Sequence, residues 1–246
     1  MESFFATNSK KSQFSGNFFN SSDLTSVQQT HLLKMYSSII AGSFVTVFGV
    51  TAFINGMVRL NSLISLLLGI GITFYLTGSS SNKSSLSITR LAAYLMLCFV
   101  IGNGLGPMIL FGNYVNPVII PTALVTTCII FISLSFGALF TKKRLSLYTT
   151  SFIFTTIAYL GLVSFFNIFT RSKFVDSLLS YAFVVVYSFY IYYDTQKTLE
   201  AVTYGERDFL LHSIQLYLDA VNLFTKIVVI LIRKHQEEED KRRKGD

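Results

Sequence analysis

The chain has few of the residues that a soluble protein needs on its surface. Only 13% of its 246 residues are charged, whereas 51% are hydrophobic, and the mean hydropathy is +0.54. Because a soluble domain usually carries about 25% charged residues, this shortage indicates that lipid is the main solvent of the chain. The charges that exist are concentrated at the ends of long apolar runs and between them. The composition therefore excludes an ordinary soluble domain and favours a membrane protein.

Cysteine and histidine are also scarce. Cys98 and Cys128 fall inside apolar runs, so we predict two small buried side chains and no disulfide framework or zinc spacing. The three histidines (His31, His212 and His235) are too few and too scattered for a convincing metal site. The net charge is +7, and the basic residues lie beside the apolar runs. This position favours anionic lipid headgroups over nucleic acid as their binding partner. We expect no tightly bound cofactor.

Seven apolar segments can be counted, most of them close to the length of about 20 residues that a bilayer requires. The joints between them are short, which forces consecutive helices to pack antiparallel. We therefore predict an all-α, polytopic membrane helical bundle with no soluble domain. Residues 1–30 form a polar segment without a removable signal peptide, residues 31–232 the membrane domain, and residues 233–246 a charged tail. The segments are 33–56, 62–77, 88–111, 117–140, 146–169, 174–194 and 209–232.

The basic residues between the segments favour a cytosolic N terminus. Two alternatives remain for the tail, because seven complete crossings would place it on the other side, whereas a final segment that dips in and returns would keep it in the cytosol. The side of the N terminus would hold Lys10, Lys11, Lys34, Lys83, Arg90, Lys142, Lys143, Arg144, Lys197 and Arg207, against Arg59, Arg171 and Lys173 on the other.

The last apolar segment carries polar residues spaced three or four apart, which a helix places on one face. Asp219 falls near its middle, where a carboxylate in lipid costs about 2.5–3.5 kcal/mol. We therefore expect this face to turn toward a polar interior and to line a cation pathway. Lys226 either reaches the end of the span or excludes cations, and His212 either senses pH or is merely solvated. The series is His212, Gln215, Asp219, Asn222 and Lys226.

A second acid, Asp194, closes the sixth apolar segment. It is either an ordinary interfacial residue or a partner of Asp219. Two carboxylates that meet in a poor dielectric cannot both ionise freely and hold one proton between them. With the proton such a pair draws two helices together, and without it the pair repels itself or recruits a cation, which makes a proton-biased gate. On a helix, Asp194 shares a face with Tyr187, Tyr190 and Lys197, and Tyr190 is part of the expected pathway.

The oxygen atoms of these side chains suit calcium, which prefers 6–8 oxygen ligands. Asp194 and Asp219 with Gln215 and Asn222 fall short of that number without water. We therefore expect a weak calcium site at the two acids, better suited to passage than to storage.

A glycine-rich string, Gly102-Asn103-Gly104-Leu105-Gly106-Pro107, interrupts the third segment. No Lys-Ser or Lys-Thr follows it, and it lies in a span, so it is not a phosphate loop. Glycines permit close helix contact and a proline removes a backbone hydrogen bond. We predict a kink or a tight helix crossing at Gly102, Gly104, Gly106 and Pro107.

Several strings together resemble those of the Bax inhibitor-1 family, in order from about residue 28 to the tail. Eukaryotic members of the Bax inhibitor-1 branch are more similar than the Golgi or glutamate-receptor-associated branches. The strings are His31-Leu32-Leu33-Lys34-Met35-Tyr36, the glycine-rich string, Pro121-Thr122-Ala123, Tyr193-Asp194-Thr195-Gln196 and Tyr217-Leu218-Asp219-Ala220-Val221-Asn222-Leu223-Phe224.

The resemblance implies a central last helix ringed by the others, residence in the endoplasmic reticulum, a pH-sensitive calcium leak and restraint of cell death. It also implies a proton-sensitive latch of two acids, which correspond to Asp194 and Asp219. The chain departs from relatives in two places. The second segment lacks the Arg that holds the latch in some bacterial relatives, with Arg59 just before it, and Gln215 stands where close animal relatives carry an acid. The end Arg243-Lys244-Gly245-Asp246 is weakly similar to a dibasic retrieval signal.

The leading hypothesis is a pH-sensitive calcium leak channel of the endoplasmic reticulum that suppresses apoptosis and is not an enzyme. One alternative is a non-conducting membrane scaffold that binds membrane proteins of the death pathway. Another is an intramembrane aspartyl protease, in which two acids share general acid and base roles. That alternative lacks its Gly-x-Gly-Asp string, because Asp219 lies in Leu218-Asp219-Ala220. Under each of these hypotheses we expect contact with membrane lipid and no binding of nucleic acid. No sequence pattern indicates an oligomeric state.

Overall fold

The computed structural model describes residues 24–79, 88–141 and 147–245, which form seven α-helices and no strand. Five of these helices are long and apolar enough to cross a membrane: α1, α3, α4, α6 and α7. The predicted all-α polytopic bundle is thereby confirmed. Of the basic residues used for orientation, Lys10, Lys11, Lys83, Lys142, Lys143 and Arg144 lie outside the described residues. The helices are α1 (Ser26–Ile54), α2 (Ser62–Gly78), α3 (Ile88–Val115), α4 (Ile119–Phe140), α5 (Leu147–Thr170), α6 (Lys173–Thr203) and α7 (Phe209–Gly245).

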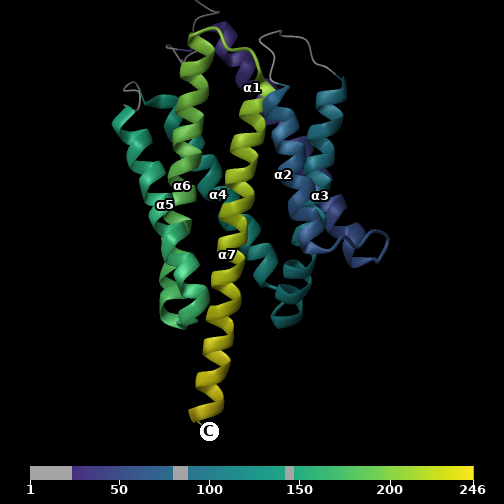
Figure 1. Cartoon of the computed structure of the whole chain (residues 1–246), viewed down its shortest axis with the longest axis vertical. Coiled ribbons are helices and arrows are strands. Elements are labelled where there is room, and N and C mark those ends of the chain that lie inside the picture. Colours follow the sequence, from purple (N-terminus) through teal and green to yellow (C-terminus); the bar gives the residue numbers. More distant parts are fainter. Residues whose placement is uncertain (1–23, 80–87, 142–146, 246) are drawn as a thin grey trace, which may run out of the picture.

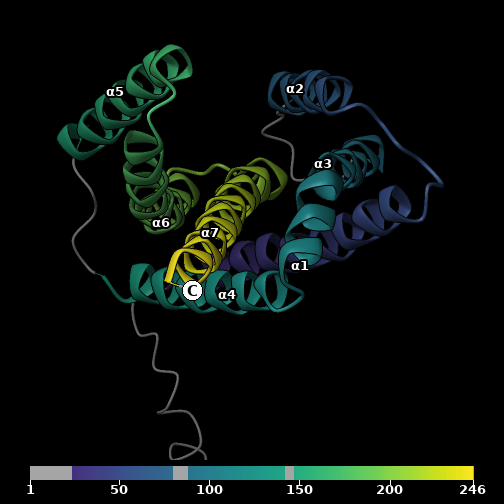
Figure 2. The ribbon, with the colours of Figure 1, turned by 90° about the horizontal axis from the view of Figure 1, so that it is seen from below.

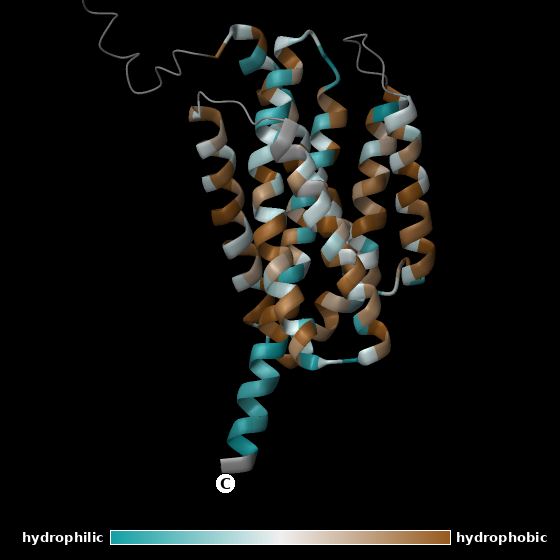
Figure 3. Ribbon diagram, turned by 60° about the vertical axis from the view of Figure 1, so that its left-hand side comes forward, coloured by the Kyte–Doolittle hydropathy of each residue, from teal (hydrophilic) through white to brown (hydrophobic). Residues whose placement is uncertain are grey.

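Consecutive helices run in alternating directions, so the start of α1 and the end of α7 lie at opposite ends of the bundle (Figure 1). The start of α1 meets the end of α6, where Gln28 Nε2 donates to Leu199 O at 3.3 Å and to Thr203 Oγ1 at 3.0 Å. The 37 residues of α7 extend about 55 Å at 1.5 Å per residue, more than the hydrocarbon core of a bilayer. Its hydrophilic final turns project beyond the bundle (Figure 3). Helix α7 is thus one continuous helix, without the turn that a segment returning to its starting side would need.

Helix α7 packs against α1, α3, α4 and α6, whereas α2 packs on α3 and α5 on α6. Seen along the bundle, α6 and α3 flank α7, with α1 and α4 beyond it on one side (Figure 2). The side of α7 between α5 and α2 is not covered by a described helix, so the expected ring is incomplete although α7 is central. Large apolar side chains such as Phe44, Phe74 and Phe169 are exposed on the outside, which suits contact with acyl chains.

Two sequence predictions need correction. Helix α6 does not end at Asp194 but continues nine residues to Thr203, so most of the predicted joint 195–208 is helical. Its polar residues remain in the helix because they are bonded inside the bundle; Gln196 Nε2, for example, donates to Ala138 O at 2.9 Å. Cys98 is buried as predicted, but Cys128 is exposed on the outside of α4, where apolar sequence reflects lipid rather than protein.

The glycine-rich string of α3 lies against α1 at a tight crossing. A Cβ atom on Gly102 would stand 2.2 Å from Thr46 O, and one on Gly106 would stand 2.4 Å from the ring of Phe53. Gly104 turns instead toward α2, where a Cβ would meet that of Ser65 at 3.3 Å. Pro107 lies inside α3, which continues as one helix on both sides of it. We call the contact around Gly102 and Gly106 the glycine crossing.

Asn103 is fully buried beside the glycine crossing and forms hydrogen bonds with the connection between α1 and α2. Its Nδ2 donates to Val58 O at 2.7 Å and to Gly49 O at 3.5 Å, and its Oδ1 accepts a hydrogen bond from Leu60 N at 3.0 Å. The side chain thereby satisfies backbone groups that a helix–helix connection would otherwise leave without partners.

Candidate functional site

Asp194 of α6 and Asp219 of α7 meet between the two helices, and we call them the carboxyl pair. Each is buried, with 9% and 8% of its surface exposed. Their carboxyl groups are close enough to act on each other, as a hydrogen bond between them would require. Because an ionised carboxylate accepts hydrogen bonds but donates none, this bond forms only when one of the two groups carries a proton. A hydrogen bond between the two carboxyl groups would therefore link the α6–α7 contact to the binding of one proton.

One oxygen of the carboxyl pair needs a partner that the described protein atoms do not supply. Asp219 Oδ2 is buried, and no donor among the described residues bonds to it. A buried acceptor without a partner costs about 1–3 kcal/mol, and a charged one costs more. A proton on either carboxyl group, or a cation between them, would remove this cost. The site is thus suited to exchange a bound proton for a bound cation.

Two phenols and one lysine surround the carboxyl pair. Tyr187 and Tyr190 are half-buried on α6 and lie within electrostatic range of Asp219, and Tyr190 also lies within range of Asp194. Lys197, exposed one turn further along α6, is the cation whose charge acts on Asp194. Arg59, just before α2, instead donates to Phe53 O at 3.2 Å. Among these two cations, only the charge of Lys197 acts on the carboxyl pair.

The polar series of α7 does not form one enclosed row. His212 and Asp219 are buried and Gln215 is half-buried, but Asn222 is exposed. Our expectation that the whole series turns inward is therefore wrong for Asn222. The helix places all five residues on one face, but the neighbouring helices cover only part of that face.

Lys226 is half-buried and packs on α6. Its Nζ atom lies 4.5 Å from the centre of the Phe183 ring, a distance typical of a cation–π contact. Lys226 therefore lies along the α6–α7 contact, about two turns from Asp219 in the direction of the tail, and forms no direct ion pair with the carboxyl pair.

Sequence reasoning missed a buried histidine contact between α1 and α7. His31 Nε2 lies 3.1 Å from His212 Nδ1, and both side chains are buried. One ring donates and the other accepts, so the contact uses a single proton between the two nitrogens. The residues are 181 positions apart, and no spacing rule could have joined them.

A second contact that the sequence does not reveal is a buried ion pair at the same end of the bundle. Arg90 Nη2 lies 2.6 Å from Asp208 Oδ2, and the same group reaches Leu76 O at 3.5 Å. Asp208 Oδ1 also accepts from Leu211 N at 3.3 Å, which caps the start of α7. The pair thereby joins the ends of α2, α3 and α7 into one unit.

The metal-binding capacity of the described residues is small. Within them, no group of three or more His, Cys, Asp and Glu side chains could hold a metal ion. A calcium ion at the carboxyl pair would therefore take its other ligands from phenol or amide oxygens and from water. Such a ligand set suits brief occupancy.

The seven-helix bundle, with two acids buried between its last two helices, defines a class of polytopic membrane protein. A family profile described as "Inhibitor of apoptosis-promoting Bax1" matches residues 28–236. Bax inhibitor 1 of Homo sapiens is 31% identical over 227 residues, which cover 90% of this chain and 93% of the human protein. That of Drosophila melanogaster is 30% identical over 218 residues (87% of each chain), and that of Arabidopsis thaliana 24% over 212 residues (86% and 84%). The chain belongs to the Bax inhibitor-1 family.

Proposed function

We propose that the chain is a pH-sensitive calcium leak channel of the endoplasmic reticulum membrane that restrains cell death. The observation that carries this proposal is the burial of Asp194 against Asp219 between two membrane helices. A structural role alone would be served better by apolar side chains of similar size, because buried charges seldom add net stability. Ionisable residues inside a membrane protein instead mark ion or proton pathways in most cases.

The gate follows from the proton that the carboxyl pair needs. With one proton, the hydrogen bond between Asp194 and Asp219 holds α6 against α7. When the proton leaves, two like charges face each other in a poor dielectric, and the helices separate or admit a cation. Calcium flux should therefore rise as the pH rises. The half-buried Tyr187 and Tyr190 would supply further oxygen atoms beside the acids.

The cellular role rests on the family. The matching profile describes an "Inhibitor of apoptosis-promoting Bax1", and a controlled leak would lower the calcium available for release from the store. No enzymatic step is part of this proposal, because exchange of a proton for a cation requires no bond to substrate.

Calcium efflux from liposomes tests the channel. The full chain is reconstituted with a calcium-sensitive dye outside, and the initial efflux rate is measured between pH 6 and pH 8. We expect the wild-type rate to increase with pH, and we expect Asp194→Asn and Asp219→Asn to remove most of that dependence. The amide of Asn donates a hydrogen bond without requiring a proton from solution, so the gate loses its trigger.

Asp176→Asn provides a matched control. Asp176 lies on the same helix as Asp194 but at its other end, where it pairs with Arg233. This variant should keep the pH dependence of the wild type. Equal flux in the wild type and both carboxyl-pair variants at every pH would refute the proposed gate.

A non-conducting scaffold is the second candidate, and the exposed Asn222 of α7 favours it. A polar side chain at that position could hydrogen-bond to a helix of another membrane protein. Under this alternative, the proteins captured with the chain, and protection from death, would survive the double change Asp194→Asn and Asp219→Asn. The leak proposal expects that protection to be lost.

The orientation we propose places the N terminus in the cytosol and the tail in the lumen, because α1 begins and α7 ends on opposite sides of the bundle (Figure 1). A dibasic retrieval signal at Arg243 and Lys244 would then face away from the cytosol, so we assign it no role. An epitope tag at each end, probed after selective permeabilisation of the plasma membrane, tests this. Only the N-terminal tag should be accessible; accessibility of both tags would contradict the orientation.

A further inference from the structure

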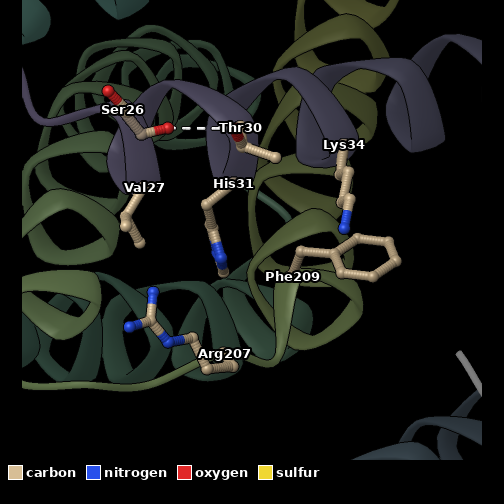
Figure 4. A pocket seen from close by; sticks show the side chains of 7 residues that line it. All are labelled: Ser26, Val27, Thr30, His31, Lys34, Arg207 and Phe209. Carbon is tan, nitrogen blue, oxygen red and sulfur yellow. Dashed lines mark hydrogen bonds between the residues drawn. The ribbon is translucent and has the colours of Figure 1, made fainter. Parts of the chain in front are cut away.

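A cavity of about 340 Å³ opens at the end of the bundle where α1 begins, far from the glycine crossing and at the side of the α6–α7 loop. It lies between the first turns of α1 and the start of α7 (Figure 4). The position corresponds to the membrane surface, because the apolar runs of both helices begin within a few residues of it. We call it the α1–α7 pocket; its lining comprises Ser26, Val27, Thr30, His31, Lys34, Arg207 and Phe209.

The lining is positively charged and includes no acid. Lys34 and Arg207 extend on either side of His31 (Figure 4). Both of these cations are close enough for their charges to act on the His31 ring. Lys34 Nζ lies 5.9 Å from the centre of the Phe209 ring, which positions the ammonium group at the pocket wall.

The neighbouring acids are already engaged elsewhere. Asp208, which also acts on His31, is paired with Arg90 at 2.6 Å. Glu206 lies 3.5 Å from His212 Nε2, on the other side of the histidine contact. The described residues include no carboxylate that forms an ion pair with Lys34 or Arg207. Within the part of the chain that the structure describes, the positive charge of the pocket therefore lacks a paired counter-charge.

The start of α1 adds donors to the same place. The first N–H groups of a helix have no acceptor within the helix and carry the positive end of its dipole. Those of Ser26 and Val27 belong to residues that line the pocket. The Thr30 hydroxyl donates to Ser26 O at 2.9 Å, so its oxygen retains the capacity to accept from a protonated ligand. Helix N-termini beside cationic side chains are favourable positions for phosphate groups.

We propose that the α1–α7 pocket binds a phosphate group, contributed either by the headgroup of an anionic lipid or by a soluble phosphate compound. The cavity is large enough for one phosphate with its immediate substituent, but not for a large ligand. Lys34 and Arg207 supply the charge, and the start of α1 supplies backbone donors. A bound phosphate would join α1 to the α6–α7 loop beside the His31–His212 contact. This inference does not depend on calcium conduction.

Binding to the full-length protein in neutral-lipid nanodiscs tests the pocket. The probes are short-chain phosphatidic acid and inorganic phosphate. Each probe is titrated into the protein, and two quantities are measured: the melting temperature of the protein and the displacement of a labelled phosphatidic acid. We expect the double variant Lys34→Gln and Arg207→Gln to weaken binding at least about tenfold, since each change removes a charge-assisted hydrogen bond. The conservative change Lys34→Arg should retain binding. Lys197→Gln, an exposed lysine at the same end but outside the pocket, should bind as the wild type does.

The two probes separate the sources of the phosphate. Competition by inorganic phosphate would assign the pocket to soluble phosphate compounds, whereas binding of phosphatidic acid without such competition would assign it to a lipid headgroup. The proposal is overturned if neither probe binds, if the double variant binds both as the wild type does, or if Lys197→Gln loses as much affinity as the double variant. Equal melting temperatures of all variants without phosphate establish that the changes leave the fold intact.

Discussion

Two helix contacts of this bundle, the glycine crossing and the carboxyl pair, differ in the kind of residue that forms them. At the glycine crossing the backbones of α1 and α3 approach so closely that no Cβ atom fits at Gly102. At the carboxyl pair, Asp194 of α6 and Asp219 of α7 are buried and act on each other, and a hydrogen bond between them would require a proton. Dispersion between the closely packed backbones stabilises the glycine crossing, which has a single geometry. The carboxyl pair has two electrostatic states. The comparison indicates a fixed half of the bundle and a half that can respond to its surroundings.

The largest effect is expected from adding one methyl group at the crossing. Gly102→Ala would place Cβ 2.2 Å from Thr46 O, so α1 and α3 would have to separate. We expect a loss of about 3 kcal/mol in stability, measured as heat stability of a fluorescent fusion in detergent. Gly71→Ala on α2 is the matched control, because no atom lies within 4 Å of its Cβ. It should leave stability unchanged or raise it by up to about 1 kcal/mol. Equal losses in both variants would show that the crossing is not tight.

Loss of the Asn103 side chain should have the next largest effect. Asn103→Ala leaves Val58 O and Leu60 N without their partners at the connection between α1 and α2. We expect a loss of about 2 kcal/mol, measured in the same assay. Asn113→Ala, an exposed asparagine on the same helix, should change stability by less than about 0.5 kcal/mol. A smaller loss for Asn103 than for Asn113 would mean that water replaces these bonds without cost.

The two contacts also differ in how well the sequence predicts them. The glycine crossing is visible in the string around Gly102, because small residues in a span have few other uses. The spans themselves are predicted by apolar length, and α2 matches its predicted segment within one residue. The continuation of α6 to Thr203 is not predicted, since hydropathy cannot show that polar residues such as Gln196 bond inside a bundle.

At the candidate site, periodicity predicts which residues share a face but not what covers that face. Asp219 is buried whereas Asn222, three residues further on, is exposed. From the sequence, the pairing of Asp194 with Asp219 is only a conditional prediction, since it depends on how α6 and α7 pack. Contacts such as His31–His212 join residues far apart in the chain and leave no local pattern. What covers a face is set by tertiary packing, and one sequence alone does not encode it in its spacing.

The carboxyl pair should make stability depend on pH, unlike the glycine crossing. Under the proposed gate, the carboxyl pair binds a proton only while α6 and α7 are in contact, so the stability of the chain should fall as the pH rises. We expect a decrease on the order of 1 kcal/mol between pH 6 and pH 8, measured as heat stability. Asp219→Asn should remove this slope, because its amide donates without a titrating proton. Gly102→Ala should lower stability by the same amount at each pH; a slope that persists in Asp219→Asn would assign it to other groups, such as the His31–His212 contact.

The smallest effect is expected at the other end of α6 and α7, where Arg233 pairs with Asp176 and donates to Ser180 Oγ at 3.3 Å. The two charged side chains remain 30% and 50% exposed, so solvent and salt screen their attraction. A double-mutant cycle with Arg233→Gln and Asp176→Asn should give a coupling energy below about 1 kcal/mol that decreases further in high salt. A coupling as large as the pH effect at the carboxyl pair would mean that α6 is held at both ends. The carboxyl pair could not then release the helix alone, and the responsive half of the bundle would need a second trigger near the tail.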